Sequence, residues 1–414
     1  MDTSQNLKME LGLENSDSLV SSVLRFLEEN RERVLNGFRN SISSPFVRFR
    51  TDFLGIQKKK YYLITSSTKG AKTQFASYTF LYTPLFEAFD HPDKRRVKIF
   101  YYNLEETPED ALLRFMSHLL YKLDNIGISP EDLQSVREGK ILNERVLELL
   151  HSEKYQKYLD FFESHIEFSE SSNPTGVWKE CIAYAEKHGK TLYKEVTVKD
   201  DFGNDKPIKK FVKYIPDDPE EYVIIFIDHV SLITQERGMS LKESIDKLSV
   251  YLKTLRNRYS YIPVVIQQQA FVGEGLEAIK EKQLRPTIAN LGDSKYPSRD
   301  CNICLGLFSP YKFDLPSYRG YDITKLKDSC RFLEVLINRG GIMGGMIGLY
   351  FNGESCYFEE LPKPSETQQL NAVYDRIRLT NENIGRTFFT FASLFKKRSK
   401  KFKLRRIKQL WQKY

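Results

Sequence analysis

The sequence predicts an α/β fold in which helices alternate with the strands of a mainly parallel sheet. The clearest sign is EEYVIIFIDHVSLI, an almost wholly apolar run whose strand ends at Asp228, which is typical of a strand buried on both faces of a parallel sheet. A second buried run, IPVVIQQQ, follows after a stretch with helical periodicity. The 414 residues are enough for one large domain of this kind with additions.

The first elements precede that strand. Apolar residues recur at helical spacing among charges between residues 16 and 39, which predicts an amphipathic helix within an N-terminal region, residues 1–44. A strand at 61–64, a helix at 73–86 and a second strand at 98–105 follow. The next helix, TPEDALLRFMSHLLYKL, is predicted to begin with a Thr cap and a Pro in its first turn. Charged helical sequence continues to about residue 169.

Between residues 190 and 215 the pattern changes to that of a β-hairpin. TLYKEVTV and IKKFVKYI alternate at period two around the polar segment KDDFGNDKP. After the strand that ends at Asp228 come a helix at about 240–258, the IPVVIQQQ strand, and strands in CNICLGLF, RFLEVLINR and GMIGLYFNG. We therefore expect one domain at 45–365 with an inserted helical and hairpin region at about 125–220.

The C-terminal residues 366–414 are predicted to form a basic tail. The last segment, KKRSKKFKLRRIKQLWQKY, has ten Lys or Arg residues and no acid, with apolar residues near helical spacing. Such a segment binds nucleic-acid phosphates, lies on an anionic membrane surface or docks on its own domain. We favour nucleic acid. The net charge of +8 and the pI near 8.9 also favour a polyanionic partner, although evenly solvated lysines account for the charge equally well.

Composition and cysteine usage narrow the class of protein. Charged residues make up 29% and aromatic residues 13%, as in a folded globular protein rather than a disordered one. We find no signal peptide and no apolar run of the about 18 residues that a membrane span requires, so we expect no transmembrane segment. Five scattered cysteines indicate a reducing compartment, such as the cytoplasm, and no disulfide framework. Cys301 and Cys304 form a CxxC, but with no second pair or nearby His we interpret them as part of a buried strand.

The stretch ITSSTKGAKTQFAS at 64–77 has the form of a phosphate-binding loop between a strand and a helix. Such a loop needs inward-facing backbone N–H groups, a helix N-terminus, a Lys that reaches the β- and γ-phosphates and a hydroxyl on Mg²⁺. Lys72 and Thr73 supply the last two. Ser66 and Ala71 stand where the framing glycines are expected, and Gly70 lies one place early, so the loop carries some strain. The candidate nucleotide contacts are Ser66, Ser67, Thr68, Lys69, Gly70, Ala71, Lys72 and Thr73, together with Asp228.

Polar side chains follow the ends of the other predicted strands. Glu105 ends the second strand, where it is placed to orient an attacking water, and Asp228 is placed to hold Mg²⁺ through water. Gln268 and Gln269 end the next strand, where an amide is able to sense a γ-phosphate. Carboxylates and amides at strand ends also cap neighbouring helices, so capping is the alternative interpretation of each of these four residues. Because the carboxyl ends of parallel strands meet at one edge of a sheet, the set as a whole favours a nucleotide site.

From about residue 45 to 355 the chain resembles the RecA-fold ATPase domain of DnaB-type replicative helicases. ITSSTKGAKTQFA resembles their Walker A motif, and FYYNLEETPEDALLRFMS resembles the segment that bears their catalytic glutamate, which implies Glu105 rather than Glu106. VIIFIDHVSLI resembles Walker B, with His229 where the family usually has an aromatic residue.

The later motifs follow in the same order. SIDKLSVYLKTLRNRYSYIPVVIQQQ resembles the helix and strand that lead to a conserved Gln, which falls on Gln269. RPTIANLGDSKYPSRDCNICLGLF resembles their Arg-Pro and Leu-x-x-Ser segment with the strand after it. EVLINRGGIMGGMIGLYFNG resembles the last strands, where the family carries a basic finger into the neighbouring subunit, and Arg339 is the nearest match.

The resemblance implies a RecA-like P-loop NTPase core that uses ATP and Mg²⁺, with the metal on Thr73 and Asp228. It implies an ATP-dependent 5′–3′ helicase that forms a hexameric ring, with Glu105, Gln269 and Arg339 as catalytic residues. Single-stranded DNA would run through the ring, held by loops after Gln269. There Lys280, Lys282 and Arg285 either contact phosphates or form a solvated helix face.

Three departures from the family keep other functions open. The primase-interacting N-terminal domain has no counterpart here, so the helix within 1–44 is expected to act as the family's linker helix. More residues than the family needs separate Glu105 from Asp228. The missing glycines also fit a RecA-fold DNA-binding or assembly protein with weak or no ATP turnover. A RecA-like recombinase or loader ATPase is a third alternative. Replication partners would bind the N-terminal helix or the basic tail.

Overall fold

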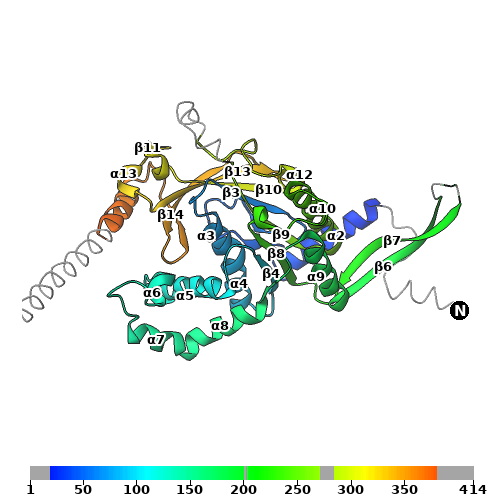
Figure 1. Cartoon of the computed structure of the whole chain (residues 1–414), viewed down its shortest axis with the longest axis horizontal. Coiled ribbons are helices and arrows are strands. Elements are labelled where there is room, and N and C mark those ends of the chain that lie inside the picture. Colours follow the sequence, from blue (N-terminus) through cyan, green and yellow to red (C-terminus); the bar gives the residue numbers. More distant parts are fainter. Residues whose placement is uncertain (1–18, 200–201, 203, 271–283, 380–414) are drawn as a thin grey trace, which may run out of the picture.

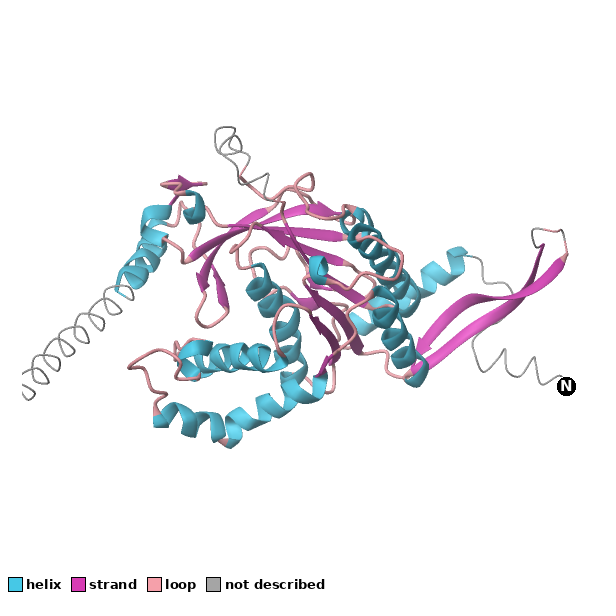
Figure 2. Cartoon of the chain, viewed as in Figure 1, coloured by secondary structure: helices cyan, strands magenta, loops and turns pink. Residues whose placement is uncertain are grey.

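The computed structural model describes residues 19–199, 202, 204–270 and 284–379. Within these residues the centre is a nine-stranded sheet of order β15-β14-β13-β10-β3-β9-β8-β4-β5 (Figures 1 and 2). The six strands from β10 to β5 in this order pair with one another in parallel, which confirms the predicted α/β fold with a mainly parallel sheet. The parallel strands are β3 (Tyr62–Ser66), β4 (Arg96–Asn103), β5 (Ile166–Phe168), β8 (Glu221–Asp228), β9 (Ile262–Gln268) and β10 (Ile303–Phe308).

The sheet separates two hydrophobic cores, because alternate residues of each central strand point to opposite faces. Tyr62 and Ile64 belong to one core, and Tyr61 and Leu63 to the other. All five residues of β3 are buried, as expected for a strand covered on both faces. Helices α3 to α8 cover the first face, and α9 and α10 cover the second.

On the first face, the helix predicted at 73–86 is one helical run with a π-helical turn, η1, in its middle. The next helix begins as predicted, with a capping box between Thr107 and Asp110 and Pro108 in its first turn. The charged sequence after it divides into short helices, each preceded by a Ser or Asn cap position. These elements are α3 (Lys72–Ser77), η1 (Tyr78–Tyr82), α4 (Thr83–Asp90), α5 (Pro108–Asp124), α6 (Pro130–Leu133), α7 (Glu144–His151) and α8 (Glu153–His165).

On the second face, α9 (Pro174–Lys187) and α10 (Leu241–Tyr259) pack side by side against β8 and β9. A capping box between Ser240 and Glu243 begins α10, close to the predicted start. The predicted hairpin is present as β6 (Gly189–Lys199) and β7 (Asp205–Pro216), which pair with each other and not with the central sheet.

The antiparallel edge of the sheet is formed by β13 (Cys330–Asn338), β14 (Met346–Asn352) and β15 (Tyr357–Glu360). Residues 367–379 of the predicted tail are helical, and Leu370 and Ile377 are buried in a third core beside α13 (Ile323–Leu326). This part of the predicted tail therefore packs on the domain. The strongly basic segment of the tail lies outside the described residues, as do Lys280 and Lys282.

The N-terminal amphipathic helix predicted between residues 16 and 39 is α2 (Leu19–Leu35).

No helix among the described residues combines the length and the apolar character needed to cross a membrane. All five cysteines are buried free thiols. The remaining elements are β1 (Ile42–Ser43), β2 (Gly55–Ile56), η2 (Val230–Leu232), α12 (Tyr296–Asp300), η4 (Tyr311–Phe313), β11 (Ser317–Tyr318) and β12 (Tyr321–Asp322).

Candidate nucleotide site

The loop between β3 and α3 lacks the two framing glycines of a phosphate-binding loop and holds two other residues in a left-handed backbone conformation. Ala71 has φ 68° and Lys69 has φ 59°, both in the left-handed region that favours glycine. A Cβ at Gly70 would lie 2.6 Å from Ser66 Oγ, so only glycine fits there. The loop therefore uses glycine for close approach at residue 70 and strains an alanine at residue 71, at a cost of about 1–2 kcal/mol.

Side chains from other elements hold this loop in place. The buried Arg331 of β13 donates from Nε to the carbonyl oxygen of Gly70 at 3.2 Å. Lys312 of η4 donates to the carbonyl oxygen of Thr68 at 2.9 Å. The sequence interpretation missed both residues. No local pattern marks them, because Arg331 is one charged residue near the start of an apolar strand and Lys312 lies in a short helical turn.

Lys72 and Thr73 face the ends of two neighbouring strands. Thr73 Oγ1 donates to Asp228 Oδ1 at 3.1 Å, and Lys72 Nζ lies 3.4 Å from Gln268 Oε1. Asp228 is 1% exposed, and burial raises the pKa of its carboxyl to about 7, with Glu105 and Glu106 adding to the rise. The residue before the helix, Ala71, makes no side-chain cap bond to its first turn.

The pair of Thr73 and Asp228 fits a magnesium ion that is shared with a substrate. The buried Asp228 carboxylate has an unfavourable charge that a cation would compensate. Mg²⁺ is commonly bound through one or two protein oxygens, waters and substrate phosphates. Among the described residues, no three His, Cys, Asp or Glu side chains are grouped as a metal site. The residues present therefore fit a Mg²⁺ ion whose remaining ligands come from a nucleotide and water.

Two glutamates follow β4, and their surroundings differ. Glu106 forms an ion pair with Arg114 through both of its oxygens. The side chain of Glu105 is half exposed, and its Oε2 lies 3.9 Å from His229 Nε2. Burial and the charge of Lys72 lower the pKa of His229, which favours the neutral ring. Of the two carboxylates, Glu106 is therefore paired with an arginine of the described chain and Glu105 is not.

The two glutamines at the end of β9 point to different partners. Gln269 is 7% exposed. Its Nε2 donates to Thr65 Oγ1 at 2.7 Å, and its Oε1 accepts from the Thr287 backbone N–H at 3.2 Å. Gln268 contacts Lys72, and its Nε2 donates to Thr68 Oγ1 at 2.9 Å. Gln268 therefore contacts the loop directly, whereas Gln269 connects β3 to the segment that begins after residue 283.

Arg339 lies away from this cluster, whereas Arg285 lines a small pocket together with Ser67 of the loop and Gln269. Asn338 at the end of β13 pairs with Ile303, which pairs with Tyr62, at the opposite end of β3 from the loop. The Arg339 guanidinium donates from Nε to the carbonyl oxygen of Cys301 at 2.8 Å and also bonds the carbonyl of Arg299. Arg285 is partly exposed and lies 3.4 Å from Glu334.

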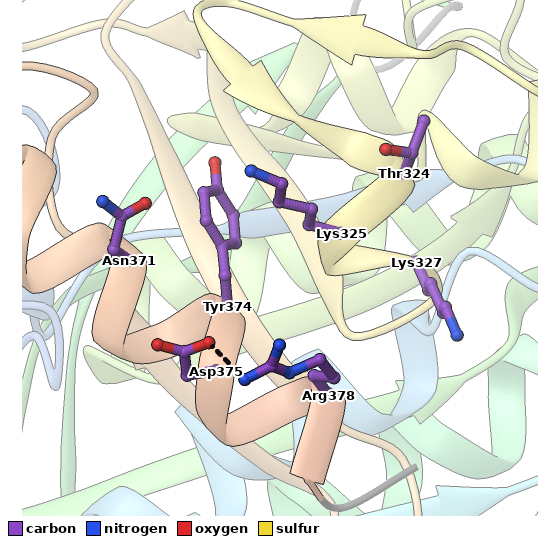
Figure 3. Close-up of a pocket in the computed structure, with 7 residues that line it drawn as sticks. All are labelled: Thr324, Lys325, Lys327, Asn371, Tyr374, Asp375 and Arg378. Carbon is purple, nitrogen blue, oxygen red and sulfur yellow. Dashed lines mark ion pairs between the residues drawn. The ribbon is translucent and has the colours of Figure 1, made fainter. Parts of the chain in front are cut away.

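A separate cavity of about 680 Å³ lies between α13 and the helix at 367–379 (Figure 3). Asp375 and Arg378 form an ion pair of 3.0 Å at its edge, and Lys325 pairs with Asp322 at 3.6 Å. None of the predicted site residues lines it, so it does not belong to the candidate nucleotide site. Its lining residues are Thr324, Lys325, Lys327, Asn371, Tyr374, Asp375 and Arg378.

No protein-family model matches this chain, and no curated protein matches its sequence. Among solved structures, one described as an ATPase domain matches with a TM-score of 0.55 and 16% identity, covering 84% of this chain and 100% of that one. A DnaB-like replicative helicase, described with its interactions with primase, matches with a TM-score of 0.55 and 14% identity, covering 87% and 72%. The chain therefore has the fold of DnaB-like helicase ATPase domains, as its sequence motifs predict.

Proposed function

We propose that this chain is an ATP-dependent DNA helicase of the DnaB type, which unwinds duplex DNA during replication by moving along single-stranded DNA as a hexameric ring. One observation carries the proposal. In a fold shared with helicase ATPase domains, Thr73 at the end of a strained loop hydrogen-bonds the buried carboxylate of Asp228, and Lys72 beside it contacts Gln268. This arrangement supports phosphoryl transfer from a Mg²⁺-bound nucleotide.

Within this proposal each residue has a distinct role. Lys72 would contact the β- and γ-phosphates, and Thr73 and Asp228 would hold Mg²⁺, which would supply positive charge beside the phosphates. Glu105 orients the attacking water. Its half-exposed side chain supports that role, because Glu106 is bound to Arg114.

Gln268 and Gln269 are proposed to link the nucleotide to DNA. The contact of Gln268 with Lys72 makes its position sensitive to a bound γ-phosphate. Gln269 bonds the Thr287 backbone, close to the segment that carries Lys280, Lys282 and Arg285. In the proposed mechanism these three cations contact single-stranded DNA. A change in the position of Gln269 would therefore change their contacts with the DNA.

Two features support assembly into a ring. Arg339 lies beyond the far end of β3, about 13 Å or more from the loop of its own subunit, since strand residues are spaced by about 3.3 Å. It is therefore proposed to act as a basic finger on a neighbouring subunit's nucleotide. Apolar residues of α2, including Leu24 and Leu27, are more than half exposed, which supports a role as a linker helix against a neighbour.

Two alternative functions are supported by features of the loop between β3 and α3 and of the nucleotide site that it forms. The strained Ala71 favours a RecA-fold DNA-binding or assembly protein with weak or no turnover, because strain there opposes a tight cradle. A recombinase or loader ATPase shares the same nucleotide site. ATP turnover separates the first alternative from a helicase, and strand displacement on a forked substrate separates the second.

The decisive experiment combines calorimetry with strand displacement. Purified protein is expected to bind ATP only with Mg²⁺ and to displace a strand from a DNA fork. Lys72→Ala abolishes both, whereas Lys187→Ala, an exposed lysine of α9, changes neither. Absence of Mg²⁺-dependent ATP binding, with or without single-stranded DNA, overturns the nucleotide site. ATP turnover without strand displacement overturns the helicase and leaves the recombinase or loader ATPase.

A further inference from the structure

The β6–β7 hairpin is an arm that stands outside the central sheet. Its strands are 11 and 12 residues long, which corresponds to an arm of about 35 Å. The base of the arm packs on the domain, where Tyr214 and Phe211 contact Tyr259 of α10 with ring centroids 5.1 and 6.0 Å apart. Figure 1 shows the rest of the hairpin extending beyond α9. An arm of this length with so little packing is available to a partner.

The two faces of this arm differ in charge. Cross-strand partners share a face, so the register assigns each side chain to one of them. One face, which we name the lysine face, has five lysines with aliphatic residues between them and no carboxylate. The lysine face consists of Lys190, Leu192, Lys194, Val196 and Val198 of β6 and Lys206, Ile208, Lys210, Lys213 and Ile215 of β7.

The opposite face pairs its charges. There Glu195 lies opposite Lys209, and Lys199 lies opposite Asp205. Such opposite-charge pairs stabilise a hairpin by a few tenths of a kcal/mol to about 1 kcal/mol each.

On the lysine face, in contrast, Lys194 lies directly opposite Lys210. Like charges in that position destabilise the hairpin. All five lysines are exposed, and none forms an ion pair within the part of the chain that the structure describes. A polyanion would remove this repulsion, so the lysine face has the charge pattern of a surface that binds one.

We propose that the lysine face binds the phosphate backbone of double-stranded DNA, outside the nucleotide site and without need of ATP. A two-stranded β-ribbon fits the major groove, which is about 12 Å wide. Single-stranded DNA is usually held by stacking on aromatic rings, and the lysine face has none, since Tyr193 and Phe211 lie on the other face. Lysines contact phosphates as point charges, so this binding is independent of base sequence. The arm would thereby hold the duplex that the proposed ring has yet to unwind.

A pair of matched double variants of the full chain tests the proposal. Lys194→Gln with Lys210→Gln removes two charges from the lysine face. Lys199→Gln with Lys209→Gln removes two from the opposite face, and the net charge of the two variants is the same. Duplex binding is measured by fluorescence anisotropy without ATP, at salt concentrations between about 50 and 200 mM.

The lysine-face variant is expected to bind duplex DNA on the order of tenfold more weakly at low salt. The negative slope of log affinity against log salt concentration becomes shallower by about 1.8, which is about 0.9 for each lost phosphate contact. The control variant binds as the parent does, and single-stranded DNA binding is unchanged in both. Equal losses in the two variants, or no loss in either, overturn the proposal. Loss of binding to vesicles of anionic lipid with unchanged duplex binding overturns it in favour of a membrane surface.

The outcome is independent of the proposed helicase activity, because the assay contains no nucleotide. Unfolding temperatures of both variants show whether the arm still folds. The lysine-face variant is expected to be at least as stable as the parent, since it removes the repulsion between Lys194 and Lys210.

Discussion

At the scale of single residues, Ala71 is held in a left-handed conformation within the candidate nucleotide loop. An L-residue with φ near +68° places its Cβ close to the following carbonyl oxygen. Neighbouring groups compensate, since Arg331 and Lys312 bind the carbonyl oxygens of Gly70 and Thr68. Contacts from distant parts of the chain therefore support the loop, together with the close approach that glycine allows at residue 70.

Replacing Ala71 by glycine should raise the free energy of unfolding by about 0.5–1 kcal/mol, because the relief of strain exceeds the extra entropy of the unfolded chain. Urea unfolding measures the change. The same substitution at Ala183, an exposed residue within α9, should instead lower stability by about 1 kcal/mol. A loss of stability in Ala71→Gly would contradict the strain at this position.

His118 makes stability depend on pH. It is buried, its Nδ1 lies 3.2 Å from the carbonyl oxygens of Ser355 and Cys356, and burial, aided by the charge of Lys122, lowers its pKa to about 3. Below pH 6.5 the unfolded chain binds a proton at this residue that the folded chain does not. This contribution is therefore fully present above pH 6.5 and is lost as the pH falls from 6.5 towards 3.

Urea unfolding at several pH values tests the contribution of His118 to the pH dependence of stability. His118→Gln, whose amide is able to donate to the same carbonyls, should reduce the loss of unfolding free energy by about 1.4 kcal/mol per pH unit between about pH 6 and 4. The exposed His91→Gln variant serves as the control. An unchanged pH dependence in His118→Gln would mean that other groups cause the acid sensitivity.

At the scale of elements, α2 is attached to the domain at its C-terminal end. Arg33 forms an ion pair with Glu220 and lies over the ring of Phe38, whereas Leu24 and Leu27 are 54% and 55% exposed. Exposed apolar residues at helical spacing need a partner surface. Within the proposed ring that surface belongs to the neighbouring subunit.

The double substitution Leu24→Glu with Leu27→Glu should therefore shift the assembly from rings towards monomers, because charge on the apolar face opposes its burial. Sedimentation velocity measures the distribution. Glu28→Gln with Glu29→Gln on the same helix, which adds no charge, should leave it unchanged. If the leucine variant assembles as the parent does, α2 is not the linker helix.

At the scale of the whole molecule, the strand order separates Arg339 from the nucleotide loop of its own subunit. The antiparallel course of β13 brings residue 339 to the end of the sheet opposite the loop. Under the proposed function, a residue in that position would act on a nucleotide of another subunit, and the proposed catalytic site would be complete only in an assembly.

Arg339→Ala should consequently retain ATP binding and lose hydrolysis, and mutant subunits should poison mixed rings. ATP turnover is measured as mutant is mixed with parent protein in increasing ratio. A fall steeper than simple dilution is expected, with Arg299→Ala, whose side chain stacks on Tyr296 of its own subunit, as the control. A linear fall would make Arg339 a structural residue at the strand end.

Local sequence patterns were sufficient for most of the elements. Apolar runs identified the buried strands that end at Ser66, Asp228 and Gln268, because a central parallel strand is covered on both faces. Period-two alternation identified the hairpin, and cap residues identified the starts of α5 and α10. The loop residues Lys72 and Thr73 were recognised by their order after a strand.

Only the tertiary structure decided which of these residues meet. The fold brings Gln268 rather than Gln269 against Lys72, places Arg331 on the loop and moves Arg339 to the opposite end of the sheet. It also packs residues 367–379, which the sequence assigned to the tail, against α13. The physical reason is that periodicity and capping are properties of neighbouring residues, whereas these contacts depend on the order and direction in which distant strands pair.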